Sequence, residues 1–167
     1  MYILGIESSC DETSAAVIEI DAEKRKILSN IVASQIDIHR LYGGVVPEIA
    51  SRAHIEAISS ITYEALEKAG LGIDDIGAIA VTAFPGLIGA LLVGVNFAKS
   101  LAYSRKIPLV AVNHMKAHVA ASYLENEDLK PPFVSLVVSG GQTSIYKVSD
   151  YRDQCMIIHV ISACAVT

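Results

Sequence analysis

Short apolar stretches separated by polar links open the chain. Residues 2–6, 15–21 and 27–34 have the length and the β-branched, aliphatic composition of strands. The links between them, at 7–13 and 22–26, are polar or charged. Because such short links join antiparallel neighbours, the pattern predicts three strands paired in that way.

Helix and strand patterns then alternate. Residues 35–46 read as a loop, and Pro47 fits the first turn of a helix, where its missing N–H costs nothing. Small and aliphatic residues recur at helical spacing after Pro47, and Gly70 fits the C-terminal stop. The segments that follow are predicted as a strand at 76–82, a helix at 87–104, a strand at 109–112 and a helix at 114–124.

A second hairpin follows Pro131 and Pro132, with strands at 133–138 and 144–148. The order β-β-β-α-β-α-β-α before it predicts an α/β fold with a mixed sheet flanked by helices. The ribonuclease-H-like first lobe of the actin-like ATPase (ASKHA) superfold has this order. We therefore expect a first lobe at 1–130 and, at 131–149, the opening hairpin of a second lobe.

Composition narrows the class of protein. Hydrophobic residues make up 52% of the chain, aromatic residues only 6%, and the formal net charge is -5, which argues against a stand-alone nucleic-acid binder. The odd count of three cysteines is typical of reduced thiols in a cytoplasmic protein. The start has no basic region of a signal peptide, and the apolar stretch at 86–98 is too short to span a bilayer, so we expect no membrane association.

Polar side chains are dense in the first turn, Glu7-Ser8-Ser9-Cys10-Asp11-Glu12-Thr13. Converging turn amides and hydroxyls can hold phosphate or acyl-phosphate oxygens, and Asp11 could position a metal or a nucleophile. A solvated hairpin turn accounts for the same residues, so both interpretations stay open.

Two further signals are each ambiguous alone. His114 and His118 lie at i and i+4 of a predicted helix and could bind zinc or iron with a third ligand, but an ordinary histidine pair has the same spacing. The glutamate of the metallopeptidase pattern H-E-x-x-H is absent between them. Ser139-Gly140-Gly141 would let backbone N–H groups approach a nucleotide, or would simply make a tight hairpin.

Five blocks in order resemble the TsaD family of tRNA threonylcarbamoyladenosine synthases. They are LGIESSCDET (4–13), YGGVVPEIASRAH (42–54), PGLIGALLVG (85–94), Asn113-His114 with His118, and Ser139-Gly140-Gly141. This motif-based resemblance runs from about Ile3 to Tyr146. It differs from the usual pattern at Phe84, at Lys116-Ala117 and at Gln142.

The resemblance implies transfer of the threonylcarbamoyl group from threonylcarbamoyl-AMP to N6 of adenosine 37 in tRNA, with TsaB-like and TsaE-like proteins as partners. It makes His114 and His118 two ligands of a catalytic Fe²⁺ or Zn²⁺ whose third ligand is not in this chain. It places Asp11 and Glu12 at the reacting centre. The residues that would line the adenylate site are Val137, Val138, Ser139, Gly140 and Gly141.

Residues 150–167 match no family motif, and our hypothesis is a truncated or frameshifted copy whose second lobe is incomplete. Because the adenylate would be gripped between two lobes, we expect negligible transfer activity from the chain alone. The alternative is a non-catalytic, TsaB-like dimerisation or scaffold module that uses the helices at 47–69 and 87–104.

Overall fold

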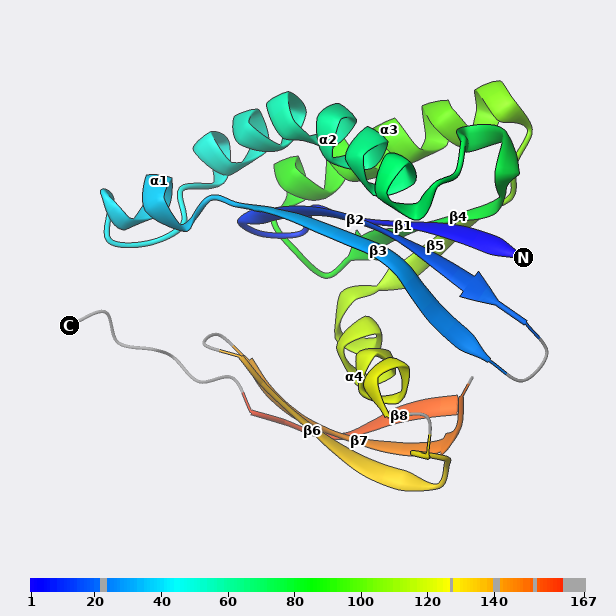
Figure 1. Ribbon diagram of the computed structural model, residues 1–167. Coiled ribbons are helices and arrows are strands. Elements are labelled where there is room, and N and C mark those ends of the chain that lie inside the picture. Colours follow the sequence, from blue (N-terminus) through cyan, green and yellow to red (C-terminus); the bar gives the residue numbers. More distant parts are fainter. Residues whose placement is uncertain (22–23, 127, 140–141, 152, 161–167) are drawn as a thin grey trace. The chain divides into compact units, whose positions relative to one another are not determined.

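A computed structural model describes residues 1–21, 24–126, 128–139, 142–151 and 153–160 (Figure 1). The chain divides into two compact units, Met1–His114 and Met115–Thr167.

The first unit is built on a five-stranded sheet in the order β3-β2-β1-β4-β5. Its strands are β1 (Tyr2–Glu7), β2 (Glu12–Ile20), β3 (Arg25–Ser34), β4 (Ile76–Phe84) and β5 (Leu109–Asn113). The pairs β1–β2 and β2–β3 are antiparallel, whereas β1–β4 and β4–β5 are parallel. The predicted mixed sheet, with its three antiparallel opening strands, is confirmed.

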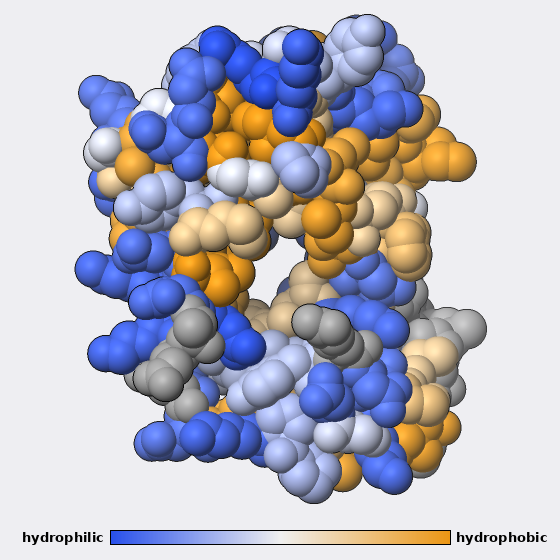
Figure 2. Space-filling view, turned by 90° about the vertical axis from the view of Figure 1, so that its right-hand side faces the viewer, coloured by the Kyte–Doolittle hydropathy of each residue, from blue (hydrophilic) through white to orange (hydrophobic). Residues whose placement is uncertain are grey.

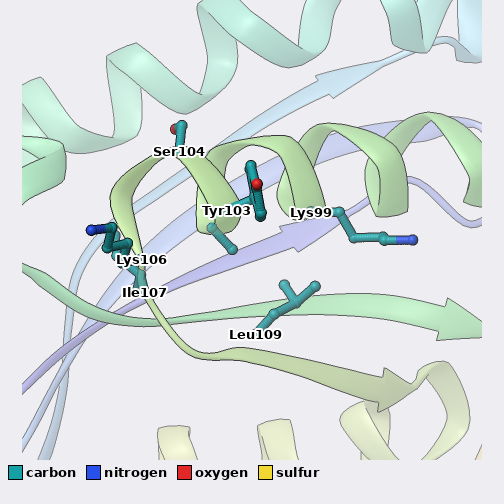
Figure 3. A pocket seen from close by; sticks show the side chains of 7 residues that line it. Lys99, Tyr103, Ser104, Lys106, Ile107 and Leu109 are labelled. Atoms are coloured by element: carbon teal, nitrogen blue, oxygen red, sulfur yellow. The ribbon is translucent and has the colours of Figure 1, made fainter.

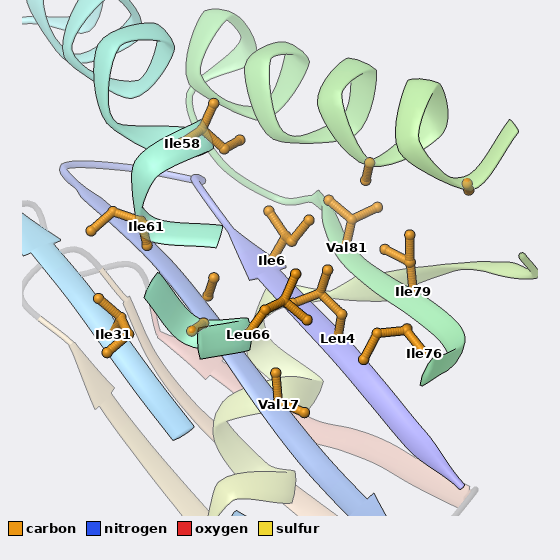
Figure 4. Packing of buried hydrophobic residues seen from close by; sticks show 14 residues of the cluster. Leu4, Ile6, Val17, Ile31, Ile58, Ile61, Leu66, Ile76, Ile79 and Val81 are labelled. Carbon is orange, nitrogen blue, oxygen red and sulfur yellow. The ribbon is translucent and has the colours of Figure 1, made fainter. Parts of the chain in front are cut away.

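Two long helices, α2 (Pro47–Ala69) and α3 (Ile88–Arg105), pack on one face of this sheet (Figure 1). The core between these helices and the sheet is aliphatic. Leu4 of β1 and Ile79 of β4 are fully buried, and Figure 4 shows their side chains within the packed cluster. On α3 the buried positions are mostly small and fall every fourth residue, at Ala90, Gly94, Ala98 and Ala102. Small residues on one helical face let α3 approach the strands closely.

The segment at 35–46, predicted as a loop, contains the short helix α1 (Ile36–Arg40), so that prediction is wrong in part. Five residues are too few to display a helical period, and α1 buries only His39. The other predicted helices are present. Gly70 caps α2 in the left-handed conformation (φ 70°), as predicted, and the 3₁₀ helix η1 (Ile73–Asp75) leads from there into β4.

The second unit contains a three-stranded antiparallel sheet and almost all of α4 (His114–Glu125). Its strands are β6 (Phe133–Ser139), β7 (Gln142–Asp150) and β8 (Asp153–Val160), in that order. Met115, Val119 and Tyr123 of α4 form its core with Tyr146 and Val148 of β7. The predicted hairpin is confirmed, and β8 lies in the segment that matched no family motif.

Among the described helices, none has the length and apolar character needed to cross a membrane.

Candidate functional site

Polar side chains gather at one edge of the five-stranded sheet. The strands β1, β4 and β5 run parallel, so their carboxyl ends lie together; Glu7 ends β1, Thr82 lies near the end of β4, and His114 follows β5 directly. Open α/β sheets bind ligands at the carboxyl ends of their parallel strands, which makes this end of the sheet the candidate site.

The carboxylate of Glu7 lies at the centre of this group. Its Oε1 accepts a hydrogen bond from the Ser9 backbone N–H (2.5 Å), and its Oε2 accepts one from Thr82 Oγ1 (2.6 Å). His114 Nδ1 lies 3.1 Å from the same Oε2 and 3.2 Å from Ser9 Oγ. A carboxylate only accepts, so in a neutral His114 ring Nδ1 carries the proton and Nε2 the lone pair.

Glu7 is ionised at neutral pH in spite of its burial. Burial alone would raise its pKa, but hydrogen bonds from His114, Ser9 and Thr82 outweigh that effect and lower the pKa to about 2. The site therefore holds a fixed negative charge against the imidazole of His114.

Hydrogen bonds join the first turn to the N-terminal part of α3. Ser8 Oγ donates to the carbonyl of Ala90 (2.8 Å) and accepts from the N–H of Gly94 (3.1 Å), two groups that a regular helix pairs with each other. The Leu87 N–H donates to Ser9 O (2.8 Å), and a Cβ on Gly86 would come within 2.6 Å of that oxygen. The block at 85–94 thus lets α3 touch the turn directly.

The hydroxyls of the turn point inward. Ser8, Ser9 and Thr13 are 0%, 3% and 1% exposed, so the solvated-hairpin interpretation is wrong for these three side chains. Asp11 is half-buried and Glu12, which opens β2, is exposed. The two predicted catalytic carboxylates therefore lie on the outer side of a turn whose hydroxyls are in the core.

Cys10 shares the turn but is a poor nucleophile. Burial, a hydrogen bond with Asp11 and the charges of Asp11, Glu12 and Glu7 together raise the pKa of its thiol to about 11. Because the thiolate is the reactive form, the raised pKa makes Cys10 slow to react at neutral pH.

The remaining predicted residues lie in the second unit. His118 is exposed on α4, one turn after His114. Val137 packs against the core of the second unit, and Val138 is 69% exposed. Ser139 ends β6, while Gly140 and Gly141 lie outside the described residues.

A third metal ligand is not evident in the part of the chain that the structure describes: no group of three His, Cys, Asp or Glu side chains is placed there to hold a metal ion.

Glu7, Ser9 and Thr82 have no individual role that their sequence pattern predicts. Thr82 had a weak signal, since it is a hydroxyl at the end of an otherwise apolar stretch. Its contact with Glu7 spans 75 positions of the chain and arises from the β1–β4 register, which local patterns do not reveal.

A surface hollow of about 700 Å³ lies elsewhere, between the end of α3 and the start of β5 (Figure 3). Lys99, Tyr103, Lys106 and Leu109 are among its lining residues. Leu109 is at the amino end of β5, whereas Glu7 is at the carboxyl end of β1. The hollow therefore lies at the amino ends of the parallel strands and is not part of the candidate site.

Comparisons with known proteins agree with the motif-based resemblance. The family model described as "TsaD: tRNA N6-adenosine threonylcarbamoyltransferase" matches residues 26–165, which extends beyond Tyr146. A protein of Clostridium beijerinckii with the name tRNA N6-adenosine threonylcarbamoyltransferase is 60% identical over 151 residues, covering 90% of this chain and 44% of the relative. The Clostridium novyi protein of that name is 61% identical over 151 residues, covering 90% of this chain and 43% of its own length. The chain thus spans less than half the length of these curated relatives.

Solved structures share the fold at low sequence identity. YeaZ from Pseudomonas aeruginosa matches with a TM-score of 0.62 and 15% identity, over 96% of this chain and 66% of its own. A Ppx/GppA family member from Aquifex aeolicus matches with a TM-score of 0.54 and 14% identity, over 96% and 51%. These neighbours have actin-like folds, so the predicted fold class is confirmed.

Proposed function

The chain belongs to the TsaD family of tRNA N6-adenosine threonylcarbamoyltransferases, and from this premise we propose that it carries part of the site for that transfer. The observation that supports the proposal best is the Glu7–His114 contact at the carboxyl ends of β1, β4 and β5. The reaction would move a threonylcarbamoyl group from threonylcarbamoyl-AMP to N6 of adenosine 37 in tRNA, in the cytoplasm.

The chemistry of His114 and His118 fits two ligands of an Fe²⁺ or Zn²⁺ ion. Imidazoles four residues apart on a helix project from the same side, and metal-binding histidines usually donate their other ring N–H to a carboxylate, as His114 does to Glu7. When bound, the metal would supply Lewis-acid polarisation of the adenylate's oxygens.

The protein's own residues would position the His114 ring and supply a negative charge next to it. Ionised Glu7 fixes the His114 ring, and Ser9 and Thr82 fix Glu7. In the transfer, N6 would form a bond to the carbamoyl carbon, the bond from that carbon to the phosphate oxygen would break, AMP would leave with the bonding electron pair, and N6 would release its proton to the solvent. We assign Asp11, with Glu12 beside it, to orient the amine during this exchange.

Adenylate binding would involve the segment from Val137 to Gly141, in which glycines would let the backbone approach the phosphate. TsaB-like and TsaE-like proteins would be the partners.

Metal titration of purified chain tests the core of the proposal. Calorimetry with Zn²⁺ should give one site that His114→Ala abolishes and that Glu7→Gln weakens by about 10- to 100-fold, since Glu7 orients the ring. Glu64→Gln, at an exposed carboxylate of α2, is the control and should leave affinity unchanged. A second titration with a non-hydrolysable threonylcarbamoyl-adenylate analogue, with and without metal, should show tighter binding with metal. Equal Zn²⁺ affinity for the wild type and Glu7→Gln would contradict the role given to Glu7.

A second candidate function, a partner-binding module, is favoured by exposed apolar residues on α2 and α3. Tyr63, Ile88 and Tyr103 are 71%, 81% and 89% exposed, and hydrophobic surface is visible in the upper part of Figure 2. Sedimentation of the chain with a TsaB-like protein tests this function. Tyr63→Asp should raise the dissociation constant of a complex that uses the exposed side chains of α2. An unchanged dissociation constant would exclude Tyr63 from the interface.

A further inference from the structure

A buried chain of hydrogen bonds connects the first turn to the segment between α1 and α2. It runs through His54 of α2, Gln35 before α1, and His39 of α1, which are 0%, 4% and 3% exposed. None of these three side chains has a role in the metal or adenylate chemistry described above.

The bonds at the turn involve two backbone carbonyls and one hydroxyl. His54 Nε2 lies 3.1 Å from Cys10 O, and the backbone N–H of Gln35 donates to Asp11 O (3.0 Å). Thr13 Oγ1 lies 2.7 Å from His54 Nδ1. Cys10, Asp11 and Thr13, which lie on the two sides of Glu12, are thus held by the same buried group.

The bonds at the other end reach the surface. His39 Nε2 lies 3.0 Å from Gln35 Oε1, and the Val46 N–H donates to His39 Nδ1 (3.3 Å). Gln35 Nε2 lies 3.4 Å from His54 Nδ1 and joins the two halves. Leu41 and Tyr42, which precede Val46, are 83% and 60% exposed.

One assignment of protons satisfies every contact. A carbonyl only accepts, so Nε2 of His54 must donate to Cys10 O, and its Nδ1 then accepts from Thr13 and Gln35. The N–H of Val46 only donates, so His39 accepts at Nδ1 and donates at Nε2. Both rings are neutral Nε2–H tautomers, and the donors of Val46, His39, Gln35 and His54 follow one another in the direction of Cys10.

We infer that His54, Gln35 and His39 are positioning residues that couple the exposed segment 41–46 to the turn carrying Asp11 and Glu12. A ligand or partner that moves segment 41–46 would thereby move these two carboxylates. The consequence for catalysis rests on the proposed function, whereas the coupling itself rests on the contacts above.

Cys10 is a probe of this coupling, because burial within the turn raises its pKa, and the hydrogen bond to Asp11 and the charges of Asp11 and Glu12 raise it further. A return from about 11 to the ordinary 9.0 would increase the thiolate fraction at pH 8, and with it the alkylation rate, by up to about 100-fold. The experiment measures iodoacetamide modification of Cys10 by peptide mass mapping, with exposed Cys155 as internal reference.

Two variants break the chain of bonds. Thr13→Val removes the hydroxyl next to His54, and Gln35→Met removes the amide between the histidines; each should increase the Cys10 rate at least about fivefold while the Cys155 rate stays constant. Thr13→Ser should restore slow labelling. Thr62→Val is the matched control, since it removes a similarly buried threonine hydroxyl that donates to Ile58 O within α2, and it should leave the Cys10 rate unchanged.

Slow Cys10 labelling in folded Thr13→Val and Gln35→Met would overturn the inference. If a variant unfolds, both cysteines will react faster, and nitrogen-15 NMR of the wild type then decides the matter. Nε2–H tautomers of His54 and His39 at pH 7 support the coupling, and an Nδ1–H tautomer or an imidazolium at either ring overturns it. Labelling and NMR use no tRNA or adenylate, so their outcome is independent of whether the transfer reaction is confirmed.

Discussion

Alanine at position 94 should separate α3 from the first turn. A Cβ on Gly94 would overlap Ser8 Oγ, a fully buried hydroxyl that bridges Ala90 O and Gly94 N. Ser8 Oγ and the added Cβ would both lie in the packed interior of the first unit, so the hydroxyl can move away only by breaking its two hydrogen bonds.

The magnitude follows from three opposing contributions. Replacing a helical glycine by alanine stabilises by about 1 kcal/mol. Loss of two buried hydrogen bonds costs about 2 kcal/mol, and overpacking adds about 1–3 kcal/mol. The net destabilisation of Gly94→Ala is therefore about 2–4 kcal/mol. Ser8→Ala alone should cost only about 1 kcal/mol, because Ala90 O and Gly94 N can then pair within the helix.

The double variant makes the prediction specific. Without Ser8 Oγ, the nearest remaining atom is the residue-8 Cβ at 3.4 Å, so Gly94→Ala should become neutral or slightly stabilising in the Ser8→Ala background. Urea unfolding followed by circular dichroism gives the free energies, and hydrogen exchange of α3 peptides assigns the transition to the first unit. Strictly additive effects of the two substitutions would refute the steric argument.

Other predictions concern pH, helix ends and surface charge. Burial lowers the pKa of His54 below its usual 6.5; the Cys10 carbonyl, Glu7 and Asp11 oppose this shift, and His39 adds to it. The free energy of unfolding should therefore be constant above about pH 6.5 and fall as the pH drops below it, because the unfolded chain then binds the proton more readily than the folded protein does. Urea midpoints that stay flat from pH 7.5 to 5 would disprove this prediction. Gly70→Ala should cost about 1 kcal/mol at the left-handed cap of α2, whereas Lys106→Gly at the corresponding cap of α3 (φ 56°) should stabilise by about 0.5–1 kcal/mol in the same urea assay. Arg105→Ala, which removes an exposed ion pair with Asp74, should change the unfolding free energy by less than about 0.5 kcal/mol, and a larger loss would show that the pair is not simply a surface contact.

The strands could be predicted because they are short apolar stretches bounded by polar links, and α2 because small and aliphatic residues recur in it at helical spacing. The short helix α1 could not, because a five-residue segment with one buried side chain has no period. Of the residues at the site, His114 could be predicted from the sequence, whereas Glu7 and Thr82 could not, for a different reason. Glu7, Thr82 and His114 come together across 75 and 107 positions through strand register, and register depends on packing of the whole sheet.

The contacts of the first turn divide its residues by task. Ser8 bonds to α3, Glu7 bonds to β4 and to His114, and Thr13 with the Cys10 carbonyl bonds to α2. Three separate elements thus fix the position of a short turn, and they do so through hydroxyls, a carbonyl and the first carboxylate.

This division explains why distant sequence blocks accompany one another in the chain. Gly86 and Gly94 lack a Cβ that would clash with the turn, so α3 can pack against it. His54, the last residue of the second block, hydrogen-bonds to the Cys10 carbonyl. Asn113-His114 places the imidazole next to Glu7. Each of these three blocks therefore contributes to the placement of a turn whose outer side presents Asp11 and Glu12. The role proposed for Asp11 and Glu12 at a reacting centre would need such support, because a small displacement costs much of the effect of orientation.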